Sequence, residues 1–244
     1  MHHIQNFVRL LAMGSLLLIA ACDDPTQPPQ ETKHAETPAQ VELVAPDHFL
    51  DENIVYVIDG SGSMSEKECS GNESKLEVAK KAVKGSIDAQ PPEVNQGLVA
   101  FDAHGGPRII APLRSGDRTA IRAGVDSIDA DGQTPLYHAI ELGNAMLLEQ
   151  MHRQNGYGLY TLAIVTDGEA NQGGGPYEVA NLARNIVTAH PIRVAALGFC
   201  MTNHSLNIPG YTLYVTVNNP ADLRKGLAEA TTETLVFDTT SFRR

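Results

Sequence analysis

Short runs of apolar residues alternate along this chain with longer segments in which apolar residues recur at helical spacing. The short runs predict strands at Asn53–Ile58, Gly97–Asp102, Arg108–Leu113, Leu159–Thr166, Ile192–Phe199 and Thr212–Val217. The longer segments predict helices at Lys75–Ala89, Arg118–Ile128, Pro135–Met151, Tyr177–Ala189 and Pro220–Thr232. Strands that are apolar on both faces and separated by amphipathic helices favour a doubly wound α/β fold, in which helices cover both faces of a mostly parallel central sheet.

One pair of neighbouring strands departs from this alternation. The predicted strands at 97–102 and 108–113 are separated by His104-Gly105-Gly106-Pro107, a hairpin-like break with no room for a helix. The second of them is therefore expected to be an antiparallel edge strand. In sheets of this class, ligands bind beyond the carboxyl ends of the parallel strands, where the strand order reverses.

A polar motif follows directly on the first predicted strand. It reads Asp59-Gly60-Ser61-Gly62-Ser63, with oxygen-bearing side chains at alternating positions. The glycines allow a tight turn, so that all three side chains can point toward one centre. A carboxylate with hydroxyls is a hard-oxygen ligand set, which suits Mg²⁺ or Mn²⁺ rather than zinc or copper. The motif therefore predicts a divalent-cation site.

Two later pieces strengthen this prediction. Thr134 lies in the segment Asp131-Gly132-Gln133-Thr134-Pro135-Leu136, just ahead of a predicted helix, and Asp167 follows the fourth predicted strand in Thr166-Asp167-Gly168-Glu169. With these pieces, residues 50 to 235 resemble the von Willebrand factor A family. The metal-ion-dependent adhesion site of that family consists of D-x-S-x-S, a Thr from a later loop and an Asp from a strand end.

The resemblance assigns the metal ligands residue by residue. Ser61, Ser63 and Thr134 are the expected hydroxyl ligands, and Asp59 and Asp167 act directly or through water. Mg²⁺ is the expected ion, with Mn²⁺ and Ca²⁺ as further candidates.

One coordination position is expected to stay open for an Asp or Glu carboxylate of a partner protein. This is docking and not catalysis, so no catalytic residue is expected and the protein is not expected to be an enzyme. Two alternatives remain: a structural scaffold with an idle metal site, and a metal-dependent hydrolase. Asp102 and Glu169, near other strand ends, are candidates for groups that orient metal-bound water.

Two cysteines stand in loops that emerge on the metal face of this family's fold. Cys69 lies in a long stretch between the metal motif and the first helix, and Cys200 follows the predicted strand Ile192–Phe199. The resemblance thus favours a disulfide between them, which would hold the long stretch beside the site. The alternative is two buried free thiols.

The N-terminal residues have the features of an export signal. An apolar segment, 10–21, follows Arg9 and ends in Ile19-Ala20-Ala21-Cys22, which resembles the lipoprotein box of bacteria. The resemblance implies cleavage before Cys22, lipidation of that cysteine and anchoring to a membrane. Asp23 resembles the signal that retains lipoproteins of Gram-negative bacteria in the inner membrane, which would place the domain in the periplasm. The alternative is an ordinary secretory signal.

The remainder of the chain divides into a tether, one domain and a tail. Residues 22–46 comprise the lipidated cysteine and a proline-rich tether, 47–237 are expected to form the globular domain, and 238–244 a tail. The formal net charge is −11. Because nucleic-acid binding needs a basic surface, no nucleic-acid partner is expected.

Overall fold

The computed structural model describes residues 41–232. The strands are β1 (Glu52–Asp59), β2 (Asn95–Asp102), β3 (Gly105–Arg114), β4 (Leu159–Thr166), β5 (Ile192–Phe199) and β6 (Leu213–Val217). The α-helices are α1 (Lys75–Ala89), α2 (Arg118–Asp126), α3 (Leu136–Arg153), α4 (Pro176–Ala189) and α5 (Pro220–Thr231). The predicted signal peptide, Cys22, Asp23, most of the tether and the tail lie outside the described residues.

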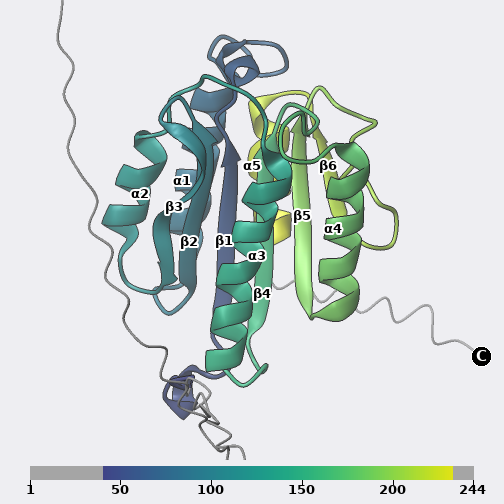
Figure 1. The fold of residues 1–244 in the computed structure, drawn as a ribbon. Coiled ribbons are helices and arrows are strands. Elements are labelled where there is room, and N and C mark those ends of the chain that lie inside the picture. Colours follow the sequence, from purple (N-terminus) through teal and green to yellow (C-terminus); the bar gives the residue numbers. More distant parts are fainter. Residues whose placement is uncertain (1–40, 233–244) are drawn as a thin grey trace, which may run out of the picture. The chain divides into compact units, whose positions relative to one another are not determined.

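The strands form one sheet in the order β3-β2-β1-β4-β5-β6 (Figure 1). Within it, β2 and β3 are antiparallel and the other neighbouring strands are parallel. This is the predicted doubly wound sheet with one antiparallel edge strand. Of the helices within residues 41–232, none is both long and apolar enough to span a bilayer.

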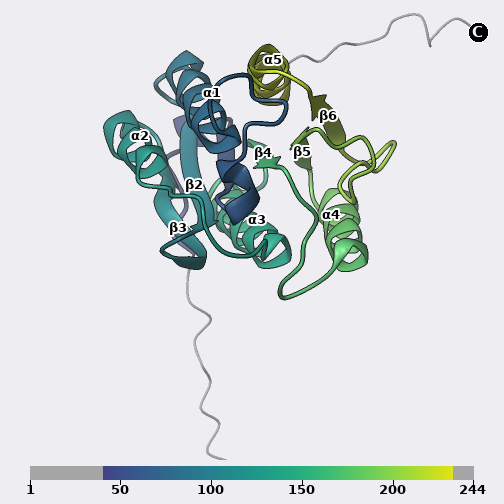
Figure 2. The same cartoon turned by 90° about the horizontal axis from the view of Figure 1, so that it is seen from above.

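Helices cover both faces of the sheet. Helices α1, α2 and α5 lie on one face and α3 and α4 on the other (Figure 2). Successive residues of β1 alternate between two hydrophobic cores: Tyr56 and Ile58 pack into the first, and Val55 and Val57 into the second. Burial on both faces explains why this strand reads as an unbroken apolar run.

The predicted elements are all present, with small differences at their ends. Helix α2 ends at Asp126 rather than at residue 128, because the Ser127 hydroxyl donates to the Gly124 carbonyl and competes with the helical pattern. A short 3₁₀ helix at Gly62–Ser65, within the metal motif, was not predicted. Asn219 caps α5, accepting hydrogen bonds from the amides of Ala221 and Asp222.

The strand order reverses beside β1. The chain passes from β1 to β2 on one side and returns to β4 on the other. Asp59 ends β1, and Asp167 directly follows β4, its parallel neighbour. The two carboxylates are therefore placed at the same edge of the sheet, at its switch point.

Candidate metal centre

Asp59 is held rigidly at the end of β1. Its side chain is fully buried. Oδ1 accepts a hydrogen bond of 2.8 Å from the Ser61 amide, and Oδ2 accepts one of 2.6 Å from the Thr166 hydroxyl. These two hydrogen bonds fix the orientation of the carboxylate, and its remaining lone pairs can coordinate a cation.

Gly60 lets the chain turn where there is no space for a side chain. Its amide donates to the Phe101 carbonyl at 2.8 Å, so the backbones of the turn and of β2 are in direct contact. A Cβ at this position would lie 2.6 Å from that carbonyl oxygen and 2.7 Å from Cβ of Asp102. The first glycine of the motif is therefore required by packing as well as by the turn.

Gly60→Ala is accordingly expected to lower the free energy of unfolding by about 2 kcal/mol, because either β2 or the metal motif must shift. Gly62→Ala is the matched control, since the nearest atom to its Cβ would be the Gly132 carbonyl oxygen at 3.6 Å, an ordinary contact. Urea unfolding of the two variants measures the difference. Equal stabilities would contradict the packing argument.

The two serines connect the motif to Asp167. Oγ of Ser61 and Oγ of Ser63 lie 3.3 Å apart, and the Ser63 hydroxyl donates to Oδ1 of Asp167 at 2.8 Å. The 3₁₀ turn that begins at Gly62 brings the second serine round to this position. Carboxylate and hydroxyl oxygens from two separate loops thus meet at the sheet edge.

Thr134 joins this group from a third loop. The Gly62 amide donates to the Gly132 carbonyl at 3.1 Å, which fixes the Thr134 loop against the metal motif. The Thr134 amide donates to Oδ1 of Asn171 at 2.8 Å, and the Asn171 amide returns a bond of 3.1 Å to the Thr134 carbonyl. A Cβ on Gly168 would have Oγ1 of Thr134 as its nearest neighbour, at 3.9 Å, so this hydroxyl faces the loop that follows β4.

Lys75, the first residue of α1, also contacts this group, although it was not predicted from the sequence. Its Nζ lies 2.8 Å from Oδ2 of Asp167 and 3.1 Å from Oε2 of Glu66. Burial disfavours the charged amine, but hydrogen bonds and charges from the two carboxylates outweigh it and raise the pKa of Lys75. A signal existed in the sequence, because a lysine in the first turn of a helix opposes the helix dipole.

Burial also changes the chemistry of Asp59. It raises the pKa of Asp59 to about 6, against hydrogen bonds from Ser61 and Thr166 that favour the charged form, and the negative charge of Asp167 adds to the rise. A fully buried carboxylate beside a second one is costly without a cation. The residue set thus fits a positive ion at this position.

Lowering the pH from 7 to 5 is expected to stabilise the metal-free domain by about 1 kcal/mol through Asp59. The folded-state pKa, about 6, exceeds the ordinary value of 3.8, so the folded state holds this proton more tightly than the unfolded chain. The gain is complete below the ordinary pKa and is lost as the pH rises through 6. Denaturant titrations of wild type and Asp59→Asn with a chelator measure it; an identical pH slope in both would refute the assignment.

The two candidates for orienting water contact other groups. The Asp102 carboxylate accepts bonds of 2.8 and 3.0 Å from the Arg108 guanidinium and one of 2.8 Å from the His104 amide. The Glu169 carboxylate accepts bonds of 2.6 Å from both the amide and the hydroxyl of Ser205. These contacts brace the β2–β3 hairpin and the loop after β5, respectively.

Cys69 and Cys200, the pair singled out from the sequence, are joined by a disulfide, with their Cα atoms 5.8 Å apart. Cys69 belongs to the loop between the metal motif and α1, and Cys200 follows β5. The bond therefore ties the segment that carries Glu66 and leads to Lys75 to the far half of the sheet.

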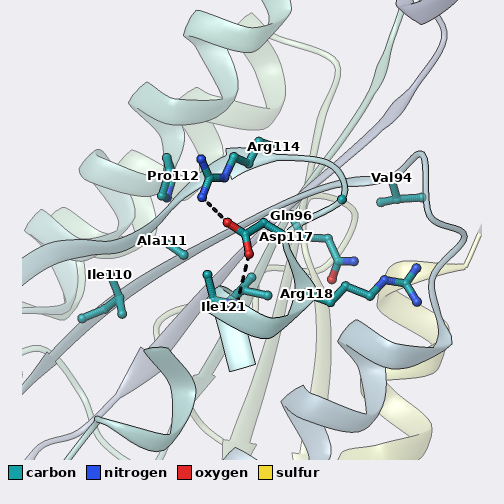
Figure 3. A pocket seen from close by; sticks show the side chains of 11 residues that line it. Val94, Gln96, Ile110, Ala111, Pro112, Arg114, Asp117, Arg118 and Ile121 are labelled. Atoms are coloured by element: carbon teal, nitrogen blue, oxygen red, sulfur yellow. Dashed lines mark hydrogen bonds and ion pairs between the residues drawn. The ribbon is translucent and has the colours of Figure 1, made fainter. Parts of the chain in front are cut away.

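Two hollows of the surface lie at different distances from the five candidate ligand residues. One lies between α2 and the β2–β3 pair, where an Arg114–Asp117 ion pair crosses it (Figure 3). It lies at the opposite edge of the sheet, because Gln96, near the start of β2, pairs with Arg114. A second hollow, lined by Gly132 and Gln133, adjoins Thr134.

The donor set fits a hard divalent cation. Two carboxylates and three hydroxyls lie at this edge of the sheet, and between residues 41 and 232 no group of three or more His, Cys, Asp or Glu side chains forms a metal site built from those residues alone. So few charged ligands do not form a closed all-protein cage, and an ion held by them keeps positions for water or an outside ligand.

This geometry agrees with the comparison to known families. Residues 54–169 match the family model of the von Willebrand factor type A domain. All five candidate ligand residues lie within the matched segment. The fold continues beyond this segment. Strands β5 and β6 complete the sheet of a von Willebrand factor A fold, and helices α4 and α5 pack against it.

The chain is similar to YwmD of Bacillus subtilis (strain 168), described as an uncharacterized protein, with 28% identity over 138 residues. The alignment covers 52% of this chain and 59% of YwmD. Among solved structures, von Willebrand factor type A from Catenulispora acidiphila gives a TM-score of 0.59 at 21% identity, over 73% of this chain and 42% of that one.

A second similar structure is proximal thread matrix protein 1 from the mussel byssus, in which zinc occupies the metal-ion-dependent adhesion site (MIDAS) motif. It gives a TM-score of 0.57 at 20% identity, over 74% of this chain and 47% of that one. At these identities the structural likeness shows the fold alone. The chain spans 59% of YwmD and less than half of either structure.

Proposed function

We propose that this protein binds a divalent cation through Asp59, Ser61, Ser63, Thr134 and Asp167 and uses it to hold an Asp or Glu carboxylate of a partner protein. The observation that carries the proposal is the placement of these five residues at the switch point of the sheet: Ser61, Ser63 and Asp167 contact one another, Asp59 ends β1 beside them, and the Thr134 hydroxyl faces the loop that carries Asp167. Residues so far apart in sequence have no other evident reason to present hydroxyls and carboxylates to one another.

The number and charge of the ligands favour docking. Asp59 and Asp167 supply the only formal negative charges among the five residues, and hydroxyls supply the rest. An ion held in this way retains positive charge and an open position, which a carboxylate from another protein can fill. Mg²⁺ is the expected ion, with Mn²⁺ and Ca²⁺ as alternatives; the zinc in the mussel protein's motif supports divalent binding by a site of this type.

The surface beside the ligands can receive a partner. The hollow next to Thr134 is lined by Gly132, Gln133 and Gln172 together with two acidic residues, Asp102, which is paired with Arg108, and the exposed Asp131. A partner loop seated there would have its carboxylate within reach of the proposed ion.

The proposal includes a place in the cell. The pattern that ends at Cys22 supports export, lipidation and membrane anchoring, and Asp23 supports retention at an inner membrane, where the domain would face the periplasm. The proline-rich residues that follow would hold the domain away from the bilayer.

Capture from a cell-envelope extract tests the docking. Immobilised wild type is compared with Thr134→Val, which keeps the shape of the threonine and removes its hydroxyl, in the presence of Mg²⁺ or of a chelator. Partners that wild type retains only with Mg²⁺, and that the variant loses, support the proposal. Retention of every partner in chelator would favour the scaffold alternative, and turnover of a captured partner would favour the hydrolase.

A further inference from the structure

Lys75 occupies an unusual position for a lysine. Only 5% of its side chain is exposed, and its ammonium group contacts Asp167, whose side chain is fully buried. Its other carboxylate partner, Glu66, is 61% exposed and therefore well screened by water. The ammonium thus acts chiefly on Asp167.

The contact changes the charge that the site offers to a cation. Asp59 and Asp167 together carry two negative charges, and the Lys75 ammonium neutralises one of them at hydrogen-bond distance. It also occupies Oδ2 of Asp167, while Oδ1 accepts from Ser63. A divalent ion would therefore bind to a site of net charge −1. The ion and the site together would then keep a net positive charge.

From this we infer that Lys75 sets the balance between two affinities of the site: it weakens binding of the resident cation and strengthens binding of an outside carboxylate. The inference rests on the proposed function and deepens it. An ion whose charge the protein fully neutralised would attract a partner's carboxylate weakly, whereas an under-neutralised ion attracts it strongly. Lys75 is a positioning residue here, acting through Asp167.

Lys75→Gln tests the inference by isothermal titration with Mg²⁺ and Mn²⁺. Removal of the positive charge is expected to tighten cation binding by about tenfold. Lys75→Arg, which keeps the charge, should bind the cations as wild type does. Lys81→Gln is the matched control, because Lys81 lies on the same helix with 61% of its side chain exposed and pairs with Glu73 at the surface.

Acetate serves as the probe for an outside carboxylate. In wild type, acetate is expected to increase the apparent affinity for Mn²⁺, because the two ligands stabilise each other at the same centre. In Lys75→Gln this enhancement should be reduced severalfold. The thermal stabilisation by Mg²⁺ provides an independent readout, and it should be larger in Lys75→Gln than in wild type.

The outcomes separate this inference from the proposed function. If wild type binds a cation and Lys75→Gln binds it equally or more weakly, the inference is wrong and the proposed function stands. If only Lys75→Gln binds a cation, the lysine itself neutralises the site, and the proposed function fails together with the part of the inference that concerns an outside carboxylate. If neither protein binds a cation, both are wrong.

Discussion

Replacement of Cys69 and Cys200 by serine is expected to lower the free energy of unfolding by about 4 kcal/mol, within the usual range for a disulfide that closes a long loop. The two cysteines are 131 residues apart, so the bond restricts most of the unfolded domain. Each kilocalorie corresponds to roughly 2–4 °C in a domain of this size, so the melting temperature should fall by about 10 °C.

Thermal unfolding of wild type and the double variant, each with and without reductant, measures this effect. Wild type should lose stability on reduction, and the variant should not respond. The sheet itself positions Asp59, which ends β1, and Asp167, which follows β4, so cation affinity should change far less than stability. A melting temperature of wild type that is indifferent to full reduction would contradict the stabilising role of the bond.

Asp59→Asn is expected to weaken Mg²⁺ and Mn²⁺ binding by about a hundredfold or more, because it removes a buried negative charge from a site with only two. The amide fits the space: its oxygen can accept from the Ser61 amide, and its nitrogen can donate to the Thr166 hydroxyl. The metal-free variant should be more stable than wild type at neutral pH, since the raised pKa of Asp59 shows that its charged form is costly.

This pairing of lost binding with gained stability distinguishes a ligand from a structural residue. Asp129→Asn is the matched control: it makes the same chemical change on a side chain that is 68% exposed, and it should alter neither property. Calorimetric titration and urea unfolding of the three proteins provide the measurements. Wild-type affinity in Asp59→Asn would remove Asp59 from the ligand set.

The sequence predicted the sheet, and the position of two candidate ligands at its edge, for one physical reason. Strands such as β1 and β4 are buried on both faces, so they read as apolar runs, and the residue after each run marks a carboxyl end. Asp59 and Asp167 were placed at the sheet edge in this way, whereas the full ligand set came from the motif and the resemblance to the von Willebrand factor A family. What the sequence could not give is which side chains cross between loops.

Lys75 and Asn171 show this limit. Lys75 reaches Asp167 across 92 positions of the chain, and Asn171 contacts Thr134 across 37, so neither pairing follows from local spacing. Asp102 shows the reverse case. It ends a strand on the correct edge and lies beside Gly60 of the metal motif, but its carboxylate accepts hydrogen bonds from Arg108 of the adjacent β3.

Paramagnetic broadening by Mn²⁺ in an amide NMR spectrum tests the central claim most directly, because it locates a bound ion without any partner. We predict that substoichiometric Mn²⁺ broadens the amides of Ser61, Ser63, Thr134 and Gly168 first, that Mg²⁺ in excess reverses the effect, and that Asp59→Asn loses it. Broadening centred elsewhere, or none at neutral pH, would contradict a divalent-cation site at this edge of the sheet.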